Sequence, residues 1–351
     1  MESFVSTVVL HSKDDEFRIL SLLTVKVQTS FITALAQFYD PLLRSFLLQD
    51  FHLTLTLEEF KGFLGFSMKG RIPYNMIGQV PKVEKLSLAL QNPIPTIMTN
   101  WNKRHSLSGF QRVYLEGEAK RLLVSRDWDV IGNVLALLIY GQVLFQTYEG
   151  FIDSTAISIF WAMWKENKST VYLLLADVFY SLHHRHEKKS GILTFCLPLL
   201  YKWLTSHVFI SNTLISDMSS TNWAQTLVSL TERDITWYRS KLNGEEIIII
   251  CGSFPNVPLI GSKGCISYNP MLATRQFGYP MLGKYEDCEL EEMILNDMDA
   301  KDPALLYKIV KSWEKIHNKF LELGKRDGVS RAKVARLGKE NEELQLTLQQ
   351  P

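Results

Sequence analysis

Cysteine is scarce in this chain, which has four cysteines among 351 residues. That number is too small for a disulfide framework to hold a protein of this size. Free thiols usually act as small buried apolar groups in a reducing compartment. We therefore expect an intracellular protein whose cysteines stay reduced: Cys196, Cys251, Cys265 and Cys288.

An excess of charge of one sign is also missing. Lysine and arginine number 38 against 37 aspartates and glutamates, which leaves a net charge of +1. This balance argues against a protein whose whole surface binds nucleic acid or an anionic membrane. Hydrophobic residues make up 46% of the chain, which is enough for a substantial buried core.

Apolar runs long enough to cross a membrane are absent. The most membrane-like stretch covers residues 130–145 and contains Asn133 and Gln142. It is shorter than the roughly 18 to 20 apolar residues that a spanning helix needs. We expect a helix buried in the protein core and no membrane association.

Motifs of known catalytic sites are missing as well: there is no nucleophile elbow, no zinc-protease motif and no dinucleotide fingerprint. The carboxylates of Glu58 and Glu59 are adjacent in sequence, so we do not expect both to point inward, and we interpret them as capping and surface charge. The sequence predicts no catalytic residue, no cofactor site and no metal site. An enzyme whose site has no recognisable motif is the alternative.

Two short motifs have more than one interpretation. His183, His184 and His186 suggest a zinc site, but their spacing to Cys196 matches no standard zinc module. Histidines at a helix end, where they interact favourably with the helix dipole, are the preferred interpretation. The glycine-flanked segment 261–264 lacks the spacing of a phosphate-binding loop and predicts a hairpin turn.

The region around residue 56 predicts a strand followed by a capped helix. Residues 51–55 alternate between apolar and polar side chains, as in a half-buried strand. Thr56 and Glu59 match a capping box, in which the Thr56 hydroxyl accepts the amide of Glu59 and the Glu59 carboxylate reaches back. Gly65 is a natural stop for the helix that follows.

The remaining patterns predict a mainly helical, globular fold with a minor β component. The β component consists of the strand near 51–55 and a strand and hairpin near 246–268. The expected helices include one that ends near residue 40 and others at about 82–90, 110–125, 128–145, 154–166, 169–185, 197–207 and 271–277.

The C-terminal part predicts a helix and the start of a coiled coil. An acidic stretch near 286–302 precedes a helix expected over 304–323. Further on, apolar residues step by three and four positions, with one asparagine at an a position, which favours a parallel homodimer in register. This seam consists of Val334, Leu337, Asn341, Leu344 and Leu348.

Basic residues flank this seam and give a second hypothesis for the function. They are spaced along the helix and followed by acidic residues, which favours a solvated flank of the coiled coil. The alternative is a nucleic-acid-binding module whose affinity falls steeply with salt. The residues concerned are Lys325, Arg326, Arg331, Lys333, Arg336 and Lys339.

Three segments together resemble a known family, the plant mobile domain. They are the stretch from Phe51 to Phe66, the helix 198–204 and the closing Arg-Gln-Phe-Gly of residues 275–278. The segment 254–270 is similar to a legume-rich, transposon-derived branch of that family. The motif residues to which we assign a structural role are Phe51, Leu53, Thr56, Glu59, Leu64, Gly65, Arg275, Gln276, Phe277 and Gly278.

The resemblance and the residue patterns together predict an N-terminal segment 1–29, a helical mobile-like domain 30–283, an acidic linker 284–303 and a C-terminal helix with the coiled-coil start 304–351. The resemblance also implies a protein in the nucleus rather than the cytoplasm, linked to gene silencing or genome maintenance. Because the motifs that can be placed are structural ones, we expect a non-catalytic interaction protein. Such domains are sometimes labelled aminotransferase-like. The chain shows no Schiff-base lysine motif or cofactor-phosphate loop, so we expect no cofactor.

Overall fold

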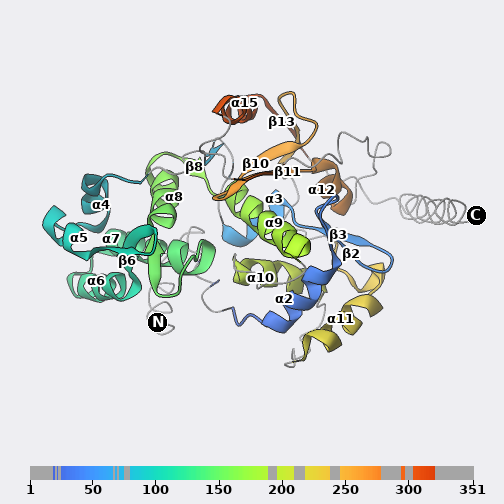
Figure 1. Ribbon diagram of the computed structural model, residues 1–351, viewed down its shortest axis with the longest axis horizontal. Helices are drawn as coiled ribbons and strands as arrows, with labels where there is room; N and C mark the ends of the chain where they lie inside the picture. Colours follow the sequence, from blue (N-terminus) through green and yellow to red (C-terminus); the bar gives the residue numbers. More distant parts are fainter. Residues whose placement is uncertain are drawn as a thin grey trace, which may run out of the picture.

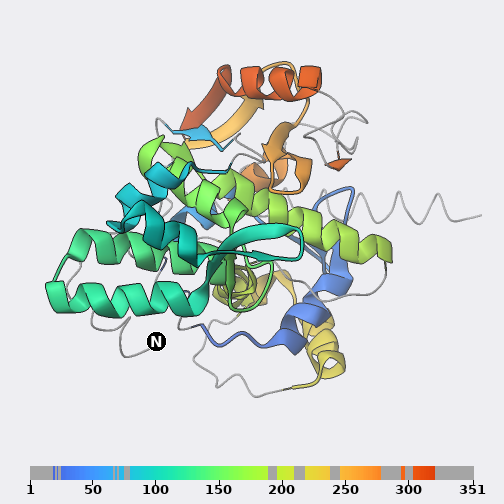
Figure 2. The same cartoon turned by 60° about the vertical axis from the view of Figure 1, so that its left-hand side comes forward.

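The central element of the fold is helix α9 (Val171–Lys188), which crosses the middle of the molecule in both views (Figures 1 and 2). This computed structural model describes residues 19, 22, 25–65, 68, 71–74, 80–188, 196–208, 218–237, 246–277, 294–296 and 303–320. Every residue of α9 from Val171 to Phe179 is buried. A helix that is enclosed on all sides belongs to the core, and α9 contacts both helices and strands.

The other helices lie on several sides of α9, and a group of them lies to its left in Figure 1. These other helices are α2 (Thr29–Leu35), α3 (Leu57–Leu64), α4 (Val83–Leu90), α5 (Ile94–Asn100), α6 (Arg112–Ser125), α7 (Trp128–Ile139), α8 (Ser154–Lys165), α10 (Leu197–Val208), α11 (Ser220–Ser229), α12 (Pro270–Gln276) and α15 (Pro303–Trp313). Short 3-10 turns occur at η2 (Ala36–Phe38) and η4 (Glu232–Asp234), and a π-helical turn at η3 (Tyr140–Leu144).

The strands are short and form several small sheets. β1 (Tyr39–Asp40), β2 (Ser45–Leu47) and β3 (His52–Thr54) make one antiparallel sheet, and β5 (Trp101–Arg104), β6 (Leu107–Gln111) and β7 (Phe151–Asp153) make another. β10 (Val257–Ile260), β11 (Gly264–Tyr268) and β12 (Ile294–Asn296) form a third. β9 (Glu246–Cys251) pairs antiparallel with β13 (Ile316–Phe320), and β4 (Ile72–Pro73) pairs parallel with β8 (Lys168–Ser169).

The predicted fold class is confirmed: the protein is mainly helical, with small sheets. β3 lies within the predicted strand 51–55. β9 contains the four consecutive isoleucines 247–250 and is the strand predicted near 246, and β10 and β11 form the predicted hairpin. Sequence reasoning missed the sheets β1–β2 and β5–β6–β7. Their strands have only two to five residues, too few for an alternating pattern to be recognised.

The apolar run 130–145 is a core helix, as predicted. Its two polar side chains bind backbone groups of neighbouring segments. Asn133 Nδ2 donates to the Ala89 carbonyl over 3.0 Å, and Gln142 Nε2 donates to the Phe151 carbonyl over 2.9 Å. Within the residues that the structure describes, no helix is both long and apolar enough to cross a membrane.

The helix expected over 304–323 is wrong in its second half. α15 ends at Trp313, and residues 316–320 form β13, which pairs with β9 (Figure 1). The β-branched run of β9 needs a partner strand for its backbone groups, and this demand overrides the helical pattern of β13. The Trp313 indole also donates to the Pro258 carbonyl over 3.0 Å, so this segment packs on the β10–β11 hairpin.

The predicted coiled-coil seam, from Val334 to Leu348, lies outside the described residues, as do the six basic residues between 325 and 339. Gly278 and most of the acidic stretch near 286–302 lie outside them too.

Candidate functional site

Five polar side chains from distant parts of the chain meet in the interior. They come from the N-terminus of α3 (Thr56 and Glu59), from α10 (Trp203 and His207) and from α12 (Gln276). We call this group the Glu59 cluster. Each of its members has 7% or less of its surface exposed. The cluster is therefore enclosed by protein.

The local sequence explains how α3 presents Glu59. Thr56 has extended backbone angles and caps the helix, because its hydroxyl accepts the Glu59 amide over 3.2 Å. At the other end, Gly65 adopts a left-handed conformation with φ of 74°, which ends the helix as predicted. The second half of the predicted capping box differs: the Glu59 carboxylate accepts the Thr56 hydroxyl proton over 2.8 Å and turns into the interior.

The Glu59 carboxylate is surrounded by donors. Its Oε2 accepts hydrogen bonds from Thr56 Oγ1, from Trp203 Nε1 over 3.0 Å and from Gln276 Nε2 over 3.0 Å. Its Oε1 lies 2.8 Å from His207 Nε2. Both oxygens are therefore occupied by groups of the protein itself.

His207 is fixed from both sides of its ring. Its Nδ1 lies 2.8 Å from the carbonyl oxygen of Thr236. A carbonyl oxygen can only accept, so Nδ1 carries a proton. The Glu59 Oε2 already accepts three hydrogen bonds, and the second oxygen of the carboxylate pairs with His207 Nε2.

The pKa of Glu59 reflects these contacts. Burial acts to raise the pKa, but attraction to His207 and hydrogen bonds from His207, Thr56 and Trp203 lower it more. The net pKa lies below its ordinary value of 4.5. Glu59 therefore stays ionised near neutral pH despite its burial.

Gln276 joins α12 to β3 as well as to Glu59. Its Oε1 accepts the Thr54 amide over 2.7 Å, and its Nε2 donates to the Thr54 carbonyl over 2.8 Å. The side chain thereby pairs with the backbone of β3 much as a neighbouring strand would. More than two hundred positions in sequence separate Gln276 from Thr54 and Glu59.

The structure brings together three of the motif residues to which we assigned a structural role: Thr56, Glu59 and Gln276. Four other motif residues are apolar and buried in the core: Phe51, Leu53, Leu64 and Phe277. Gly65 is the C-cap of α3. Arg275 belongs to α12.

Sequence reasoning missed Trp203 and His207 as members of the cluster. Both lie in the predicted helix 197–207, for which the sequence indicated no polar partner. The available signal was the spacing of four, which places an indole N–H and an imidazole on one face of an otherwise apolar helix.

The prediction that Glu58 and Glu59 do not both point inward is wrong. Glu58 is 1% exposed and Glu59 is 7% exposed. α3 packs against both α9 and α10, so two side chains that diverge by about 100° are both covered. Glu58 lies beside Tyr172 and Tyr268, and burial, together with this carboxylate, raises the pKa of Tyr268.

A second buried carboxyl group binds the loop of the β10–β11 hairpin. The turn is closed by the Gly261 amide, which donates to the Gly264 carbonyl over 2.7 Å. The Ser262 amide donates to Asp177 Oδ1 of α9 over 2.7 Å. A Cβ on Gly261 would lie 2.5 Å from that oxygen, so the close approach requires glycine. The glycine-flanked loop therefore binds an internal carboxyl group.

Asp177 differs from Glu59 in its protonation. Burial raises the pKa of Asp177 to about 7, against weaker opposing effects of the Ser262 hydrogen bonds and the Lys263 charge. Lys263 is partly buried, and burial lowers the pKa of its amine. With fewer donors than Glu59, Asp177 changes charge close to neutral pH.

The histidines of α9 are spread around the end of the helix. His183 is buried and lies 3.4 Å from Glu187, whereas His184 and His186 are exposed. Within the part of the chain that the structure describes, no group of three or more histidine, cysteine, aspartate or glutamate side chains is arranged to hold a metal ion.

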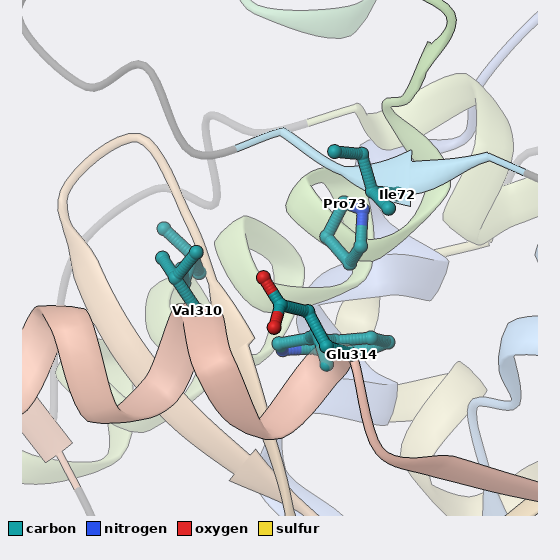
Figure 3. Close-up of a pocket in the computed structure, with 6 residues that line it drawn as sticks. Ile72, Pro73, Val310 and Glu314 are labelled. Atoms are coloured by element: carbon teal, nitrogen blue, oxygen red, sulfur yellow. The ribbon is translucent and has the colours of Figure 1, made fainter.

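A small pocket lies between β4 and the end of α15, with Ile260 of β10 in its lining (Figure 3). Its volume is about 50 Å³, and its lining is apolar apart from Glu314, whose carboxylate pairs with Lys311 over 2.8 Å. Pockets that bind cofactors or substrates usually measure roughly 300 to 1,000 Å³. This pocket is too small for either.

The fold and the Glu59 cluster define a mainly helical domain in which buried polar contacts join distant segments. The chain belongs to the family described as Domain of unknown function (DUF7745), whose model matches residues 5–339. No curated protein and no solved structure matches the chain.

Replacing Glu59 by glutamine tests the contribution of the cluster to stability. Glu59→Gln breaks the buried pair with His207, and we expect a loss of about 3 kcal/mol in the free energy of unfolding. Because the folded-state pKa of Glu59 is lowered, this contribution is present above about pH 4.5 and is lost as pH falls through the folded-state value.

The measurement is urea unfolding at pH 7 and at pH 4, followed by tryptophan fluorescence. Glu116→Gln is the matched control, because Glu116 forms a half-exposed pair with Arg112 that contributes at most about 0.5 kcal/mol. Equal stability of the two variants at pH 7 would contradict a stabilising cluster.

Replacing Asp177 by asparagine tests the second carboxyl group. The folded state retains the Asp177 proton up to about pH 7, whereas the unfolded state loses it near pH 4, so this group lowers stability as pH rises between those values. We expect the wild-type protein to lose about 2 kcal/mol more than Asp177→Asn between pH 5 and pH 8.

Thermal unfolding at the two pH values measures this difference. The control is Asp129→Asn, a substitution of an exposed carboxylate in the first turn of α7. If the Asp177→Asn protein follows the wild-type pH dependence, Asp177 does not titrate in this range.

Proposed function

We propose that this protein is a non-catalytic interaction protein whose helical domain serves as a scaffold. The observation that carries this proposal is the closed Glu59 cluster. An acid and a base lie 2.8 Å apart there, but each is 7% or less exposed and is bound by other groups of the chain. Groups arranged in this way hold helices together and present no open side to a substrate.

The resemblance to the plant mobile domain supports the same proposal. The residues that carry the resemblance include Thr56, Glu59 and Gln276, and the cluster gives a physical reason for these residue types at these positions. On this basis we propose a transposon-derived, mobile-like domain in a nuclear protein that takes part in gene silencing or genome maintenance.

The C-terminal seam is the proposed means of assembly. β13 pairs with β9 and precedes the seam by about a dozen residues in sequence. Pairing of two chains through Leu337 and Leu344 would therefore hold their two helical domains close together. A lone asparagine in the seam, Asn341, favours parallel pairing in register because its best partner is its own copy. Basic residues 325–339 would then flank the paired helices.

The test is affinity capture from nuclease-treated plant nuclear extract with three forms of the full chain. They are the wild type, the seam variant Leu337→Glu with Leu344→Glu, and the control Ala335→Glu, which lies off the seam. We expect the wild type and the control to retain the same proteins in stoichiometric amounts. The seam variant should retain at least tenfold less, because its domains no longer associate through the seam.

Two results would overturn the proposal. The first is that no protein is retained in stoichiometric amount by the wild type. The second is that retention occurs only without nuclease and disappears as salt is raised, which would favour the nucleic-acid-binding alternative.

A further inference from the structure

Helix α6 carries apolar residues on two opposite faces. The inward face consists of Leu115, Ala119 and Leu122, all buried. On the outward face Val113 is 74% exposed and Val124 is 88% exposed. A helix on the surface of a globular protein normally has one apolar face, which covers the core. The outward valines of α6 are therefore not covered by the part of the chain that the structure describes.

The outward residues form a continuous stripe. Val113, Gly117, Lys120 and Val124 follow one another at steps of four, three and four, which is the spacing of a coiled-coil seam. Residues at these steps lie above one another along one side of a helix. We call these four residues the α6 stripe.

Gly117 is the least expected member of the stripe. A Cβ at this position would meet no atom within 4 Å, so nothing in the fold requires glycine there. Glycine inside a helix costs roughly 1 kcal/mol relative to alanine. Because Gly117 has no side chain, the middle of the stripe is a flat place, that is, a stretch of bare helix backbone, on which a long side chain of a partner can lie.

The stripe is well placed for contact with another molecule. α6 packs against α7 on its inner side, and the two helices lie at the outer edge of the molecule, away from α10 and α11 (Figures 1 and 2). Lys120 is exposed and forms no salt bridge with another described residue. Glu116, one residue before Gly117, binds Arg112 through Oε1 over 2.8 Å.

We propose that the α6 stripe binds the α6 stripe of a second copy of this chain, with the two helices antiparallel about a two-fold axis. In this arrangement Val113 of each copy faces Val124 of the other, and Lys120 faces Gly117. The midpoint between Val113 and Val124 is also the midpoint between Gly117 and Lys120. One two-fold axis through that point therefore relates both pairs, as an isologous contact requires. The Lys120 stem covers the flat place at Gly117, and its ammonium group reaches Glu116 of the other copy.

Charge decides between the antiparallel and the parallel arrangement. Parallel helices in register would place Lys120 against Lys120 of the other copy, and like charges repel. The antiparallel arrangement instead forms two equivalent pairs of Lys120 with Glu116. Because α6 has 14 residues, the contact is smaller than a standard interface of about 1,600 Å², and we expect a weak dimer.

Disulfide cross-linking tests the geometry directly. The background is the full chain with Cys288→Ser and with the seam variant Leu337→Glu and Leu344→Glu, so that pairing through the seam cannot contribute. Cys196, Cys251 and Cys265 are buried and remain. Val113→Cys and Val124→Cys proteins are oxidised separately and as a mixture with copper phenanthroline.

We expect the mixture to form a disulfide-linked dimer, with at least tenfold less from either protein alone. The control is Val228→Cys, because Val228 on α11 is also an exposed valine, at 49%, but lies off the stripe. Efficient cross-linking of each single variant with itself would overturn the antiparallel arrangement. Equal cross-linking with Val228→Cys would show random collision and overturn the contact.

Sedimentation equilibrium of Gly117→Arg, in the same background, gives a second readout. The monomer has space for this side chain, so thermal unfolding should be unchanged or shifted upward. Filling the flat place should weaken dimerisation by about tenfold or more. Unchanged dimerisation would overturn the proposal.

Discussion

The carboxylate of Glu59 imposes the constraint on which the rest of the fold depends. A charge that loses its water must be paired and hydrogen-bonded, or its burial costs several kcal/mol. Here the donors come from the helix cap, from α10 and from α12, and a fourth contact passes through His207 to the backbone at Thr236. An arrangement of the chain that lacks one of these segments leaves the carboxylate incompletely satisfied, so the segments are required together.

Asp177 and Glu59 show how the number of donors decides the protonation of a buried carboxyl group. Burial acts to raise the pKa of both groups. Glu59 has a cationic partner and three further donors, and its pKa falls below the ordinary value. Asp177 receives the loop amide at Ser262 and lies near the partly buried Lys263, and its pKa stays near 7. The first group keeps its charge near neutral pH, whereas the second changes its charge close to pH 7.

Much of the fold could be predicted from the sequence where local rules apply. The Thr56 cap, the stop at Gly65 and the turn at 261–264 follow from backbone preferences of a few neighbouring residues, and the structure has all three. The prediction of a helix over 304–323 was wrong in its second half because β13 pairs with β9, a strand that is distant along the chain. The small sheets were missed for a related reason, since their pairing depends on the packing of the helices around them.

The candidate site was predictable in part. Thr56, Glu59 and Gln276 were identified through the motif, but sequence alone does not show that they touch. Trp203 and His207 could not be assigned to the cluster, because their partners are distant along the chain. The inward direction of both Glu58 and Glu59 depends on α3 being covered by α9 and α10, which only the tertiary structure reveals.

The most direct test of the account is a double-mutant cycle between Glu59 and His207, measured by urea unfolding at pH 7. It compares Glu59→Gln, His207→Gln and the double variant. If the two side chains form a buried ion pair that joins α3 to α10, the double variant should lose at least about 1.5 kcal/mol less than the sum of the single variants. Losses that add to within about 0.5 kcal/mol would show that the pair does not join these helices.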